Sequence, residues 1–595
     1  MRKWEKEKAY SFNETDKTKP VYVIDTPPPY TNGVLHMGHV SDYSFIDFIA
    51  RYKRMKGFNV LYPQGWDTMG FHTEITVEKK YGKNLDEKEF LEKCEALTTD
   101  NLVKMREQMK LLGFSVDFSR EYITMSREYK AKVQLSLLLM YEKGLLYIGD
   151  HAVYWCPYCK TAIAREQIED KEEKTKLNYV RFDMEGGSAE QLTIATTRPE
   201  LLHACVAVAV NPTDERYAKY IGKQVSIPLF GRKVKIIGDE DVDVSFGTGA
   251  EMVCTFGDKK DLVIYHRHKL DEIKAIDEGG HLLNAGKYTG LSIQDARSAI
   301  ISDLEKEGRI TKKEEILHTI KIHEDCKQPI ELLHSTEWFS KTTDFVNEIK
   351  EQANKIKWIP EITKRYLMDW ANYIDWDWVI SRDRRFDTPL PFWICKSCGY
   401  IVGADKKSLP VNPRVDAPPV DKCPKCGGEL AGEKRTCDVW IDSSITPLVI
   451  AGWPDNKELF SRAFPSDIRI NATEIIRSWD FYTIYRVWAL TGNIPWKNIF
   501  VHGLILGPDG RKMSKSIGNV VSPEELIKTY SADSVTMWAA LSGTMQGDKA
   551  LIFNDVKFAH SFINKLFNSL EFARPALSGY VPSSSDMANM DIFDK

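Results

Sequence analysis

The stretch Val21–His39 reads VYVIDTPPPYTNGVLHMGH and decides the fold that the sequence predicts. Its first four residues are typical of a short buried strand, and the three prolines that follow cannot continue a strand ladder. An Asn-Gly pair then supplies turn chemistry, and apolar residues recur at helical spacing over 40–52. A strand, a turn and a helix N-terminus present backbone N–H groups to an anion, so His36 and His39 can face one phosphate.

A second segment of the same kind is HGLILGPDGRKMSKSIGN at residues 502–519, which follows an apolar strand expected at 499–501. A loop with glycine hinges and two lysines, Lys512 and Lys515, can close over a triphosphate and neutralise its charge. Each segment taken alone has a simpler interpretation, a capped turn for HMGH and a solvated basic turn for the lysine loop. The two together favour nucleotide binding.

These segments resemble the HIGH and KMSKS signatures of the class I aminoacyl-tRNA synthetases, in the family's order and each after a strand. The resemblance implies an α/β fold, namely a Rossmann-type catalytic domain with an inserted β-rich editing domain and zinc-binding modules. The catalytic residues that it implies are His36, His39, Lys512 and Lys515. The ATP-binding residues that it implies are Gly38, Glu474, Ser514 and Ser516.

An amino-acid site is expected after the second strand, at 59–62, where a carboxylate at a strand's carboxyl end can meet an ammonium group. The resemblance implies that Pro29, Asp67 and Trp479 bind the amino acid. The sequence also departs from the family's usual pattern in three places. The departures are Thr68, Met69, Phe71 and His72 after Asp67, then Asp383 where a glutamine is general, then Ala472 and Glu474 where glycine and aspartate are usual.

Most of the eleven cysteines fall into pairs with the two-residue gap of zinc sites. One predicted site is a Cys₄ ribbon, because two CxxC pairs each precede a glycine: Cys395, Cys398, Cys423 and Cys426. The other joins two distant halves into a Cys₃His site: Cys156, Cys159, His323 and Cys326. The remaining four cysteines are interpreted as buried apolar residues.

The segment between the halves of the second site has many short strands with glycine turns, which predicts a small β-barrel. It resembles the editing insertion of the valyl, isoleucyl and leucyl enzymes. An aspartate beside hydroxyl residues can hold the ammonium of a mischarged amino acid and orient a water molecule for ester hydrolysis. The editing residues that the resemblance implies are Thr196, Thr197, Arg198, Thr255, Asp258 and Asp261.

The length of 595 residues predicts several domains, and the 43% hydrophobic content is ordinary for globular protein. The catalytic domain is expected to begin with residues 1–160, to be interrupted by the editing domain on a zinc-clamped stalk at 161–325, and to resume at 326–394. The zinc ribbon is expected at 395–430 and the second half of the catalytic domain at 431–520. Stem-contact helices are expected at 521–557, and the start of a helical anticodon-binding domain at 558–595. A net charge of −4 gives no overall nucleic-acid footprint. Without a long apolar run or a signal peptide, we expect a cytoplasmic monomer with no membrane partner.

The resemblance within the family is greatest to the valyl enzymes of the archaeal type, through IDTPPPY, GTGAEMVCTFGDKKD and DSSITPL. It implies activation of valine with ATP and Mg²⁺, transfer to tRNA, and hydrolysis of mischarged threonine, with Zn²⁺ as a structural metal. A valine pocket cannot strongly reject threonine, which is nearly isosteric, so an editing domain is needed. Two alternatives stay open: an isoleucyl enzyme, and a paralogue that activates an amino acid or binds a ligand without charging tRNA.

Overall fold

The computed structural model describes residues 2–185, 190–513, 518–542 and 547–581. Its centre is a five-stranded parallel sheet in the order β15-β23-β22-β1-β2. The strands are β1 Val21–Asp25, β2 Asn59–Leu61, β15 Lys357–Ile359, β22 Ser466–Ala472 and β23 Trp496–His502. The three strands that the sequence predicts at 21–24, 59–62 and 499–501 are therefore confirmed, and they belong to one sheet.

The sheet reverses its direction of growth between β1 and β22, which are neighbours. The first half of the chain continues from β1 to β2 on one side, while β22 leads to β23 on the other. Loops that leave two such strands diverge, and a ligand crevice forms at their carboxyl ends. The sequence places HMGH after β1 and Glu474 after β22, so both meet at this crevice.

Helices surround the central sheet, and the first of them explains the opening stretch of sequence. Helix α2, Met37–Met55, begins directly after His36 and ends before Gly57, which has a φ of 87°. The other helices of the body are α1 Arg2–Lys6, α3 Phe71–Tyr81, α4 Glu87–Leu112, α5 Arg127–Glu142, α8 Val346–Lys355, α9 Lys364–Tyr373, α10 Val439–Ser443, α11 Thr446–Ile450, α12 Lys457–Ala463 and α13 Phe481–Thr491. Short strand pairs accompany them: β3 Pro63–Trp66 with β4 Asp117–Ile123, and β17 Ser381–Arg382 with β21 Thr436–Cys437.

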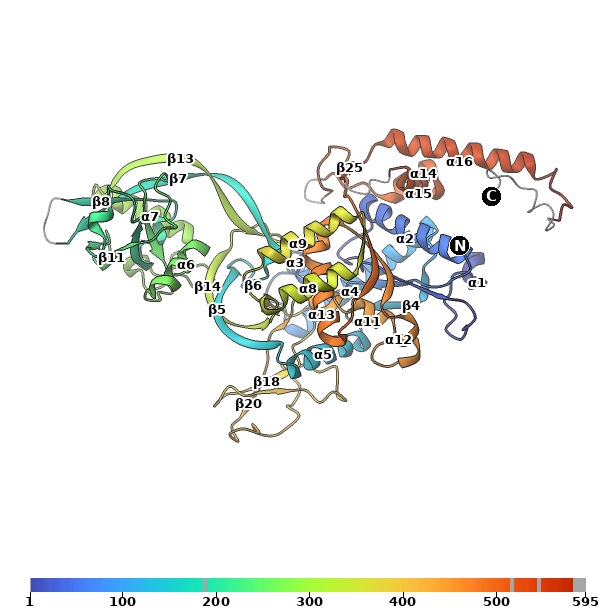
Figure 1. Ribbon diagram of the computed structural model, residues 1–595, viewed down its shortest axis with the longest axis horizontal. Coiled ribbons are helices and arrows are strands. Elements are labelled where there is room, and N and C mark those ends of the chain that lie inside the picture. Colours follow the sequence, from blue (N-terminus) through green and yellow to red (C-terminus); the bar gives the residue numbers. More distant parts are fainter. Residues whose placement is uncertain (1, 186–189, 514–517, 543–546, 582–595) are drawn as a thin grey trace.

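An insertion projects from the body on long curved strands (Figure 1). The stalk is a four-stranded sheet, β16-β14-β5-β6, made of β5 Leu146–Cys156, β6 Thr161–Ile163, β14 Glu331–Ser340 and β16 Trp378–Val379. From it rises an antiparallel ribbon of β7 Ile168–Met184 and β13 Ile310–His323. The ribbon leads to β8 Gln191–Thr196, β9 Cys205–Val210, β10 Gln224–Ser226, β11 Lys233–Gly238, β12 Ala250–Cys254, α6 Lys259–His268 and α7 Ile293–Lys306.

The insertion is rich in strands, as predicted, and its end strands β12 and β8 lie beside each other. The order is β12-β9-β11-β10-β7-β13, and β8 also pairs with β7. Strand β7 spans 17 residues and pairs in turn with β13, β8 and β10. Because one long strand has three partners and also forms the ribbon, the sheet branches at β7, and whether it closes into the predicted small barrel is decided by how β12 and β8 meet.

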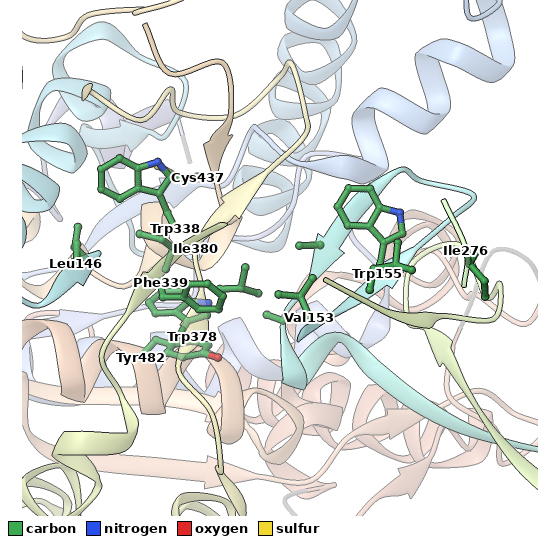
Figure 2. Packing of buried hydrophobic residues seen from close by; sticks show 14 of the residues in the cluster. Leu146, Val153, Trp155, Ile276, Trp338, Phe339, Trp378, Ile380, Cys437 and Tyr482 are labelled. Carbon is green, nitrogen blue, oxygen red and sulfur yellow. The ribbon is translucent and has the colours of Figure 1, made fainter. Parts of the chain in front are cut away.

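The stalk is fixed to the body by a core of large aromatic side chains (Figure 2). Trp378 of β16 stacks on Tyr482 of α13, with ring centroids 3.7 Å apart and planes 14° apart. Trp338 of β14 is fully buried, and its indole N–H donates to Glu433 Oε2 at 2.7 Å. Burying several aromatic rings contributes a few kcal/mol each, on the order of 2–3. The base of the stalk therefore belongs to the body's core.

Two smaller parts complete the molecule. The Cys₄ segment is a three-stranded sheet of β18 Phe392–Cys395, β19 Ile401–Gly403 and β20 Leu430–Gly432. After β24 Ile505–Leu506, helices α14 Pro523–Tyr530 and α15 Ala532–Leu541, and β25 Lys549–Ala550, the chain enters the long helix α16, Phe553–Ala573, which lies over α14 and α15 (Figure 1). No helix among the described residues has the length and apolar content that crossing a membrane requires.

Candidate functional site

A cavity of about 280 Å³ lies at the carboxyl ends of β1, β22 and β23. Both halves of the catalytic fold contribute to it, and so do the loops that carry the two sequence signatures. The structure brings together eight residues that the sequence analysis assigned to the site: Pro29, His36, Gly38, His39, Asp67, Glu474, Trp479 and Lys512. The other three, Ser514, Lys515 and Ser516, lie outside the described residues, so their roles stay predictions.

The HMGH segment holds its two imidazoles in a fixed orientation. His36 caps helix α2, and its Nδ1 accepts a hydrogen bond from the Gly38 N–H at 3.1 Å. His39 Nδ1 accepts from the His36 N–H at 3.2 Å, and the two ring centroids are 4.0 Å apart. Since each Nδ1 accepts, the hydrogen of each neutral ring lies on Nε2. Both rings, together with a helix N-terminus, can therefore donate to an anionic oxygen.

Glycine is required at position 38 by the packing of the first imidazole. A Cβ atom built on Gly38 would lie 2.8 Å from the His36 ring. Any larger residue would displace that ring and break its cap. The glycine of this signature therefore serves the geometry of its neighbour, the His36 ring.

Asp67 supplies a buried carboxyl on the opposite wall. It forms a β-bridge with Tyr30, its N–H donates to Pro29 O at 3.1 Å, and its Oδ1 accepts from Thr124 Oγ1 at 3.2 Å. The residue is 4% exposed, and no ion pair reaches it from the described residues. Burial, followed by the charge of Asp442, raises the pKa of Asp67 well above its usual value. A ligand with an ammonium group would provide the missing counter-charge.

The mouth of the cavity is crossed by an ion pair that the sequence analysis did not foresee. Lys512 Nζ lies 2.6 Å from Glu474 Oε2, and the two side chains are 63% and 39% exposed. The resemblance assigns Lys512 to the phosphates of a nucleotide and Glu474 to its ribose. Because an exposed ion pair is worth only about 0–1 kcal/mol, a nucleotide can separate them at small cost.

The sequence analysis missed a third histidine, His502, at the end of β23. Its Nε2 lies 2.8 Å from Asp42 Oδ1 and its Nδ1 lies 2.8 Å from Gly503 O. Both partners are acceptors, so only a protonated ring would donate to both of them. Burial lowers the pKa of His502, but the hydrogen bond and charge of Asp42 raise it more. The sequence signal that could have identified His502 is its position directly after a predicted strand, as for the HMGH segment.

The family model described as tRNA synthetases class I (I, L, M and V) matches residues 1–551. The chain belongs to this family. It is 48% identical to the valine--tRNA ligase of Methanocaldococcus jannaschii over 583 residues, covering 97% of this chain and 66% of that protein. It is 49% identical to the valine--tRNA ligase of Pyrococcus furiosus over 582 residues, covering 96% of this chain and 65% of that protein.

Two solved structures share the fold of this chain. A ternary complex of Agrobacterium radiobacter LeuRS with tRNA and LeuAMS has a TM-score of 0.57 at 21% identity, covering 97% of this chain and 76% of that chain. Mycobacterium tuberculosis methionyl-tRNA synthetase with methionyl-adenylate has a TM-score of 0.52 at 16% identity, covering 96% and 76%. The predicted Rossmann-type class I fold is thereby confirmed. The chain spans about two thirds of the length of the ligases named above.

The unusual segment Asn471–Glu474 of this synthetase sits on a buried charge cluster. Arg469 is fully buried, 3.3 Å from Asp25 Oδ2 and 3.4 Å from Asp480 Oδ1, and its guanidinium lies over the ring of Trp479. Asn471 Nδ2 donates to Asp480 Oδ2 at 3.1 Å. Burial lowers the pKa of Arg469 to about 10 and raises the pKa of Asp480 to about 6. Asn471 thus helps to hold the charge cluster that packs beneath Trp479, and Trp479 lines the cavity.

Both predicted metal sites come together in the fold, and in each the four ligand atoms lie within 4.8 Å of one another. In the ribbon, Cys395 and Cys426 Sγ are 3.5 Å apart, and Cys398 and Cys423 Sγ are 3.7 Å apart. A tetrahedral zinc ion with Zn–S bonds of about 2.3 Å needs Sγ atoms about 3.8 Å apart. These spacings fit zinc.

The second set of four ligands, which we call the knuckle, is Cys156, Cys159, His323 and Cys326. Its halves come from strands β5 and β13, which reach the same end of the stalk although about 160 residues separate them in sequence. The Sγ atoms of Cys159 and Cys326 each lie 3.4 Å from His323 Nδ1. Nδ1 is therefore the nitrogen of His323 that faces the other three ligands. Three thiolates and one imidazole are a donor set typical of structural zinc.

The residues assigned to editing surround the first turn of α6, but several have structural partners. Thr196 Oγ1 accepts from the Arg198 N–H at 2.9 Å. The Arg198 guanidinium forms ion pairs with Glu200 at 3.0 Å and Glu331 at 2.7 Å, which ties the insertion to the stalk. Thr255 Oγ1 donates to Asp271 O and accepts from the Ile273 N–H, both at 3.1 Å, so its hydroxyl already has both kinds of partner. Thr197 is half-buried at the same loop.

Two aspartates remain as candidates for ligand binding in the insertion. Asp258 caps α6 by accepting from the Asp261 N–H at 2.8 Å. The carboxyl of Asp261 lies against Gly257, where any side chain would collide with it. Burial, followed by the charge of Asp258, raises the pKa of Asp261 well above its usual value. As at Asp67, a carboxyl held without a counter-charge can receive an ammonium group.

Proposed function

We propose that this chain activates valine with ATP as an aminoacyl-adenylate, passes it to tRNA, and hydrolyses threonine that is charged in error. The observation that carries the proposal is the single cavity in which both signature segments face a buried carboxyl, Asp67. Identity of 48–49% to valine--tRNA ligases supports valine as the amino acid. Thiolate ligands at the two metal sites favour a reducing compartment, so we place the reaction in the cytoplasm.

The first step joins the valine carboxylate to the α-phosphorus of ATP and releases pyrophosphate. Asp67 binds the ammonium group of valine, and the Nε2–H groups of His36 and His39 donate to the phosphates. His502, whose pKa is raised by Asp42 against the effect of burial, would add positive charge on the same side when protonated. Mg²⁺, when bound, offsets the charge of the pyrophosphate. Catalysis of this kind needs orientation and charge neutralisation more than acid–base groups.

The ion pair at the mouth then exchanges partners as the nucleotide enters. Lys512 moves from Glu474 to the phosphates, and Glu474 accepts from the ribose hydroxyls. In the second step a ribose hydroxyl at the 3′ end of tRNA attacks the activated carbonyl, and AMP leaves. Editing would take place in the insertion, where Asp261 holds the ammonium of the threonyl ester while water attacks it.

The test is amino-acid-dependent exchange of pyrophosphate into ATP, run with all twenty amino acids. Valine should give the largest kcat/KM, and an equal or larger value for isoleucine would favour the isoleucyl alternative. No exchange with any amino acid would refute the proposed activation. Aminoacylation of tRNA is measured separately, so that a chain that activates valine without charging tRNA is recognised as such.

Asp67→Asn provides the matched variant, because it keeps the size of the side chain and removes the charge. Losing the counter-charge of a buried ammonium costs about 2–5 kcal/mol, so valine affinity should fall at least thirtyfold with little change in ATP affinity. Burial raises the pKa of Asp67 and a bound ammonium group would lower it again, so we expect valine binding to release a proton from any of this carboxyl that is protonated in the free chain. Calorimetry in buffers of different ionisation enthalpy should show that proton release in the parent and not in the variant.

A further inference from the structure

The first turn of α3, four residues after Asp67, contacts the knuckle directly through Phe71 and indirectly through His72, by way of Asp325. The Phe71 ring lies beside the imidazole of His323, with centroids 5.5 Å apart and planes 32° apart. His72 Nε2 lies 3.1 Å from Asp325 Oδ1, and Asp325 Oδ2 lies 3.4 Å from His323 Nε2. A carboxylate on the outer nitrogen of a metal-binding histidine is a common way to orient that ring. Here the same carboxylate also holds the start of α3.

A third connection runs through Arg384, which lies between the same two elements. Its Nη2 donates to Cys159 O in the knuckle at 2.8 Å, and its Nη1 lies 3.4 Å from Glu74 Oε2 in α3. The guanidinium also stacks over the Phe71 ring, 4.0 Å from the centroid. Three independent contacts therefore fix the start of α3 to the knuckle. Figure 1 shows α3 beside β6, where the stalk reaches the body.

From α3 the contacts continue into the amino-acid cavity through Tyr30. The Tyr30 ring meets His72 edge-on, with centroids 6.0 Å apart and planes 85° apart. It also fills the space next to Gly70, where a Cβ atom would lie only 3.2 Å away. Tyr30 pairs with Asp67 through its backbone, and both residues line the cavity. A shift of the start of α3 would thus move the wall that faces the ammonium group of the substrate.

We propose that His72 is a positioning residue for amino-acid binding, which transmits the geometry of the metal-bound knuckle through Tyr30 to the wall beside Asp67. The proposal rests on the proposed function, because it takes that cavity as the amino-acid site. Phe71 and His72 are two of the positions at which the sequence departs from the family's usual pattern, and both touch the knuckle. The departures thus have a physical use here: they connect the pocket to the metal site.

The experiment compares His72→Ala with Lys80→Ala, a change on the exposed side of the same helix. Equilibrium binding of valine and of ATP is measured by calorimetry, and zinc is measured by elemental analysis on the same samples. We expect His72→Ala to weaken valine binding about tenfold, equivalent to about 1.4 kcal/mol, with ATP binding within twofold and two zinc ions retained. Lys80→Ala should match the parent in all three, and His72→Gln, which keeps an N–H donor, should recover part of the valine affinity.

Two results would overturn the proposal: valine binding by His72→Ala as tight as that of the parent, or loss of zinc from that variant, which would mean that His72 serves the metal and not the pocket. If His72→Ala does not fold, Phe71→Leu tests the same connection and should weaken valine binding about threefold. A parent that binds another amino acid in place of valine would contradict the proposed function alone, and the variants would then be compared with that amino acid.

Discussion

Asp387 is a buried carboxyl whose Oδ1 has no hydrogen-bond partner among the described residues. It is 6% exposed and borders a second cavity of about 1010 Å³, which adjoins the amino-acid site at Tyr30 and Trp440. We predict that Asp387→Ala stabilises the catalytic body at neutral pH. Most substitutions of buried residues destabilise a protein, so a gain in stability here would be distinctive.

The magnitude follows from the missing partners. Burying a polar group without a hydrogen bond costs about 1–3 kcal/mol, and alanine removes that cost. Some packing is lost, but the side chain borders an open cavity, so no sealed void forms. We expect a net gain of about 1–2 kcal/mol at pH 7.

The pH dependence has a definite sign. Burial, followed by the charges of Glu74 and Asp442, raises the pKa of Asp387 well above its usual value in the folded state. In the unfolded chain this carboxyl ionises near pH 3.9. At neutral pH the raised pKa therefore lowers the free energy of unfolding, whereas below about pH 4 the carboxyl is protonated in both states and has no such effect. The advantage of Asp387→Ala should therefore grow as the pH rises from about 4 to 7 and shrink as it falls.

The assay is the urea midpoint of the catalytic body, followed by tryptophan emission at pH 4.5 and pH 7. Asp438→Ala is the matched control, because Asp438 borders the same cavity but accepts from Trp378 Nε1 at 2.9 Å and from Arg382 Nη2 at 2.7 Å. Removing it leaves a buried guanidinium without its partner and should cost about 3 kcal/mol or more. A lower midpoint for Asp387→Ala at pH 7, or a gain independent of pH, would refute the reasoning.

Three further predictions concern the metals and the two reactions. Elemental analysis should find two zinc ions per chain, and a metal-free chain that is folded and active would refute both sites. Lys515→Ala should lower the rate of pyrophosphate exchange about 10²–10³-fold while ATP binding changes much less, by analogy with loss of one oxyanion donor. Asp261→Ala should abolish hydrolysis of preformed Thr-tRNA and leave exchange intact; unchanged hydrolysis would remove Asp261 from the editing site.

The sequence predicted the central sheet, the α2 helix and the convergence of the ligand residues, because these depend on local patterns. Strand β1 and helix α2 each have a clear apolar period, and CxxC spacing is a strong local signal. The signature segments meet because they follow β1 and β23, two strands of one parallel sheet whose carboxyl ends lie at the same edge. No long-range information was needed once the order of the strands was implied.

The rest depends on contacts between distant residues, which no periodicity records. The raised pKa of His502 depends on Asp42, which lies 460 positions away. The support beneath Trp479 requires Arg469 to meet both Asp25 and Asp480. The role of Thr255 was predicted from a motif, yet its hydroxyl has two backbone partners in the fold. A motif specifies residue types, whereas the surrounding fold determines which of their atoms remain available.

The Lys512–Glu474 ion pair suggests how a ligand-free cavity of this kind stays ready for a nucleotide. Without a partner, a lysine in this position would extend into solvent and a glutamate would lie beside a cavity meant for an anion. Paired at 2.6 Å, each side chain stays at the mouth with its charge neutralised. We propose that phosphate oxygens replace the carboxylate on Lys512 and ribose hydroxyls replace the ammonium on Glu474 when a nucleotide binds. Each side chain then exchanges one partner for another, so binding leaves neither with a large uncompensated charge.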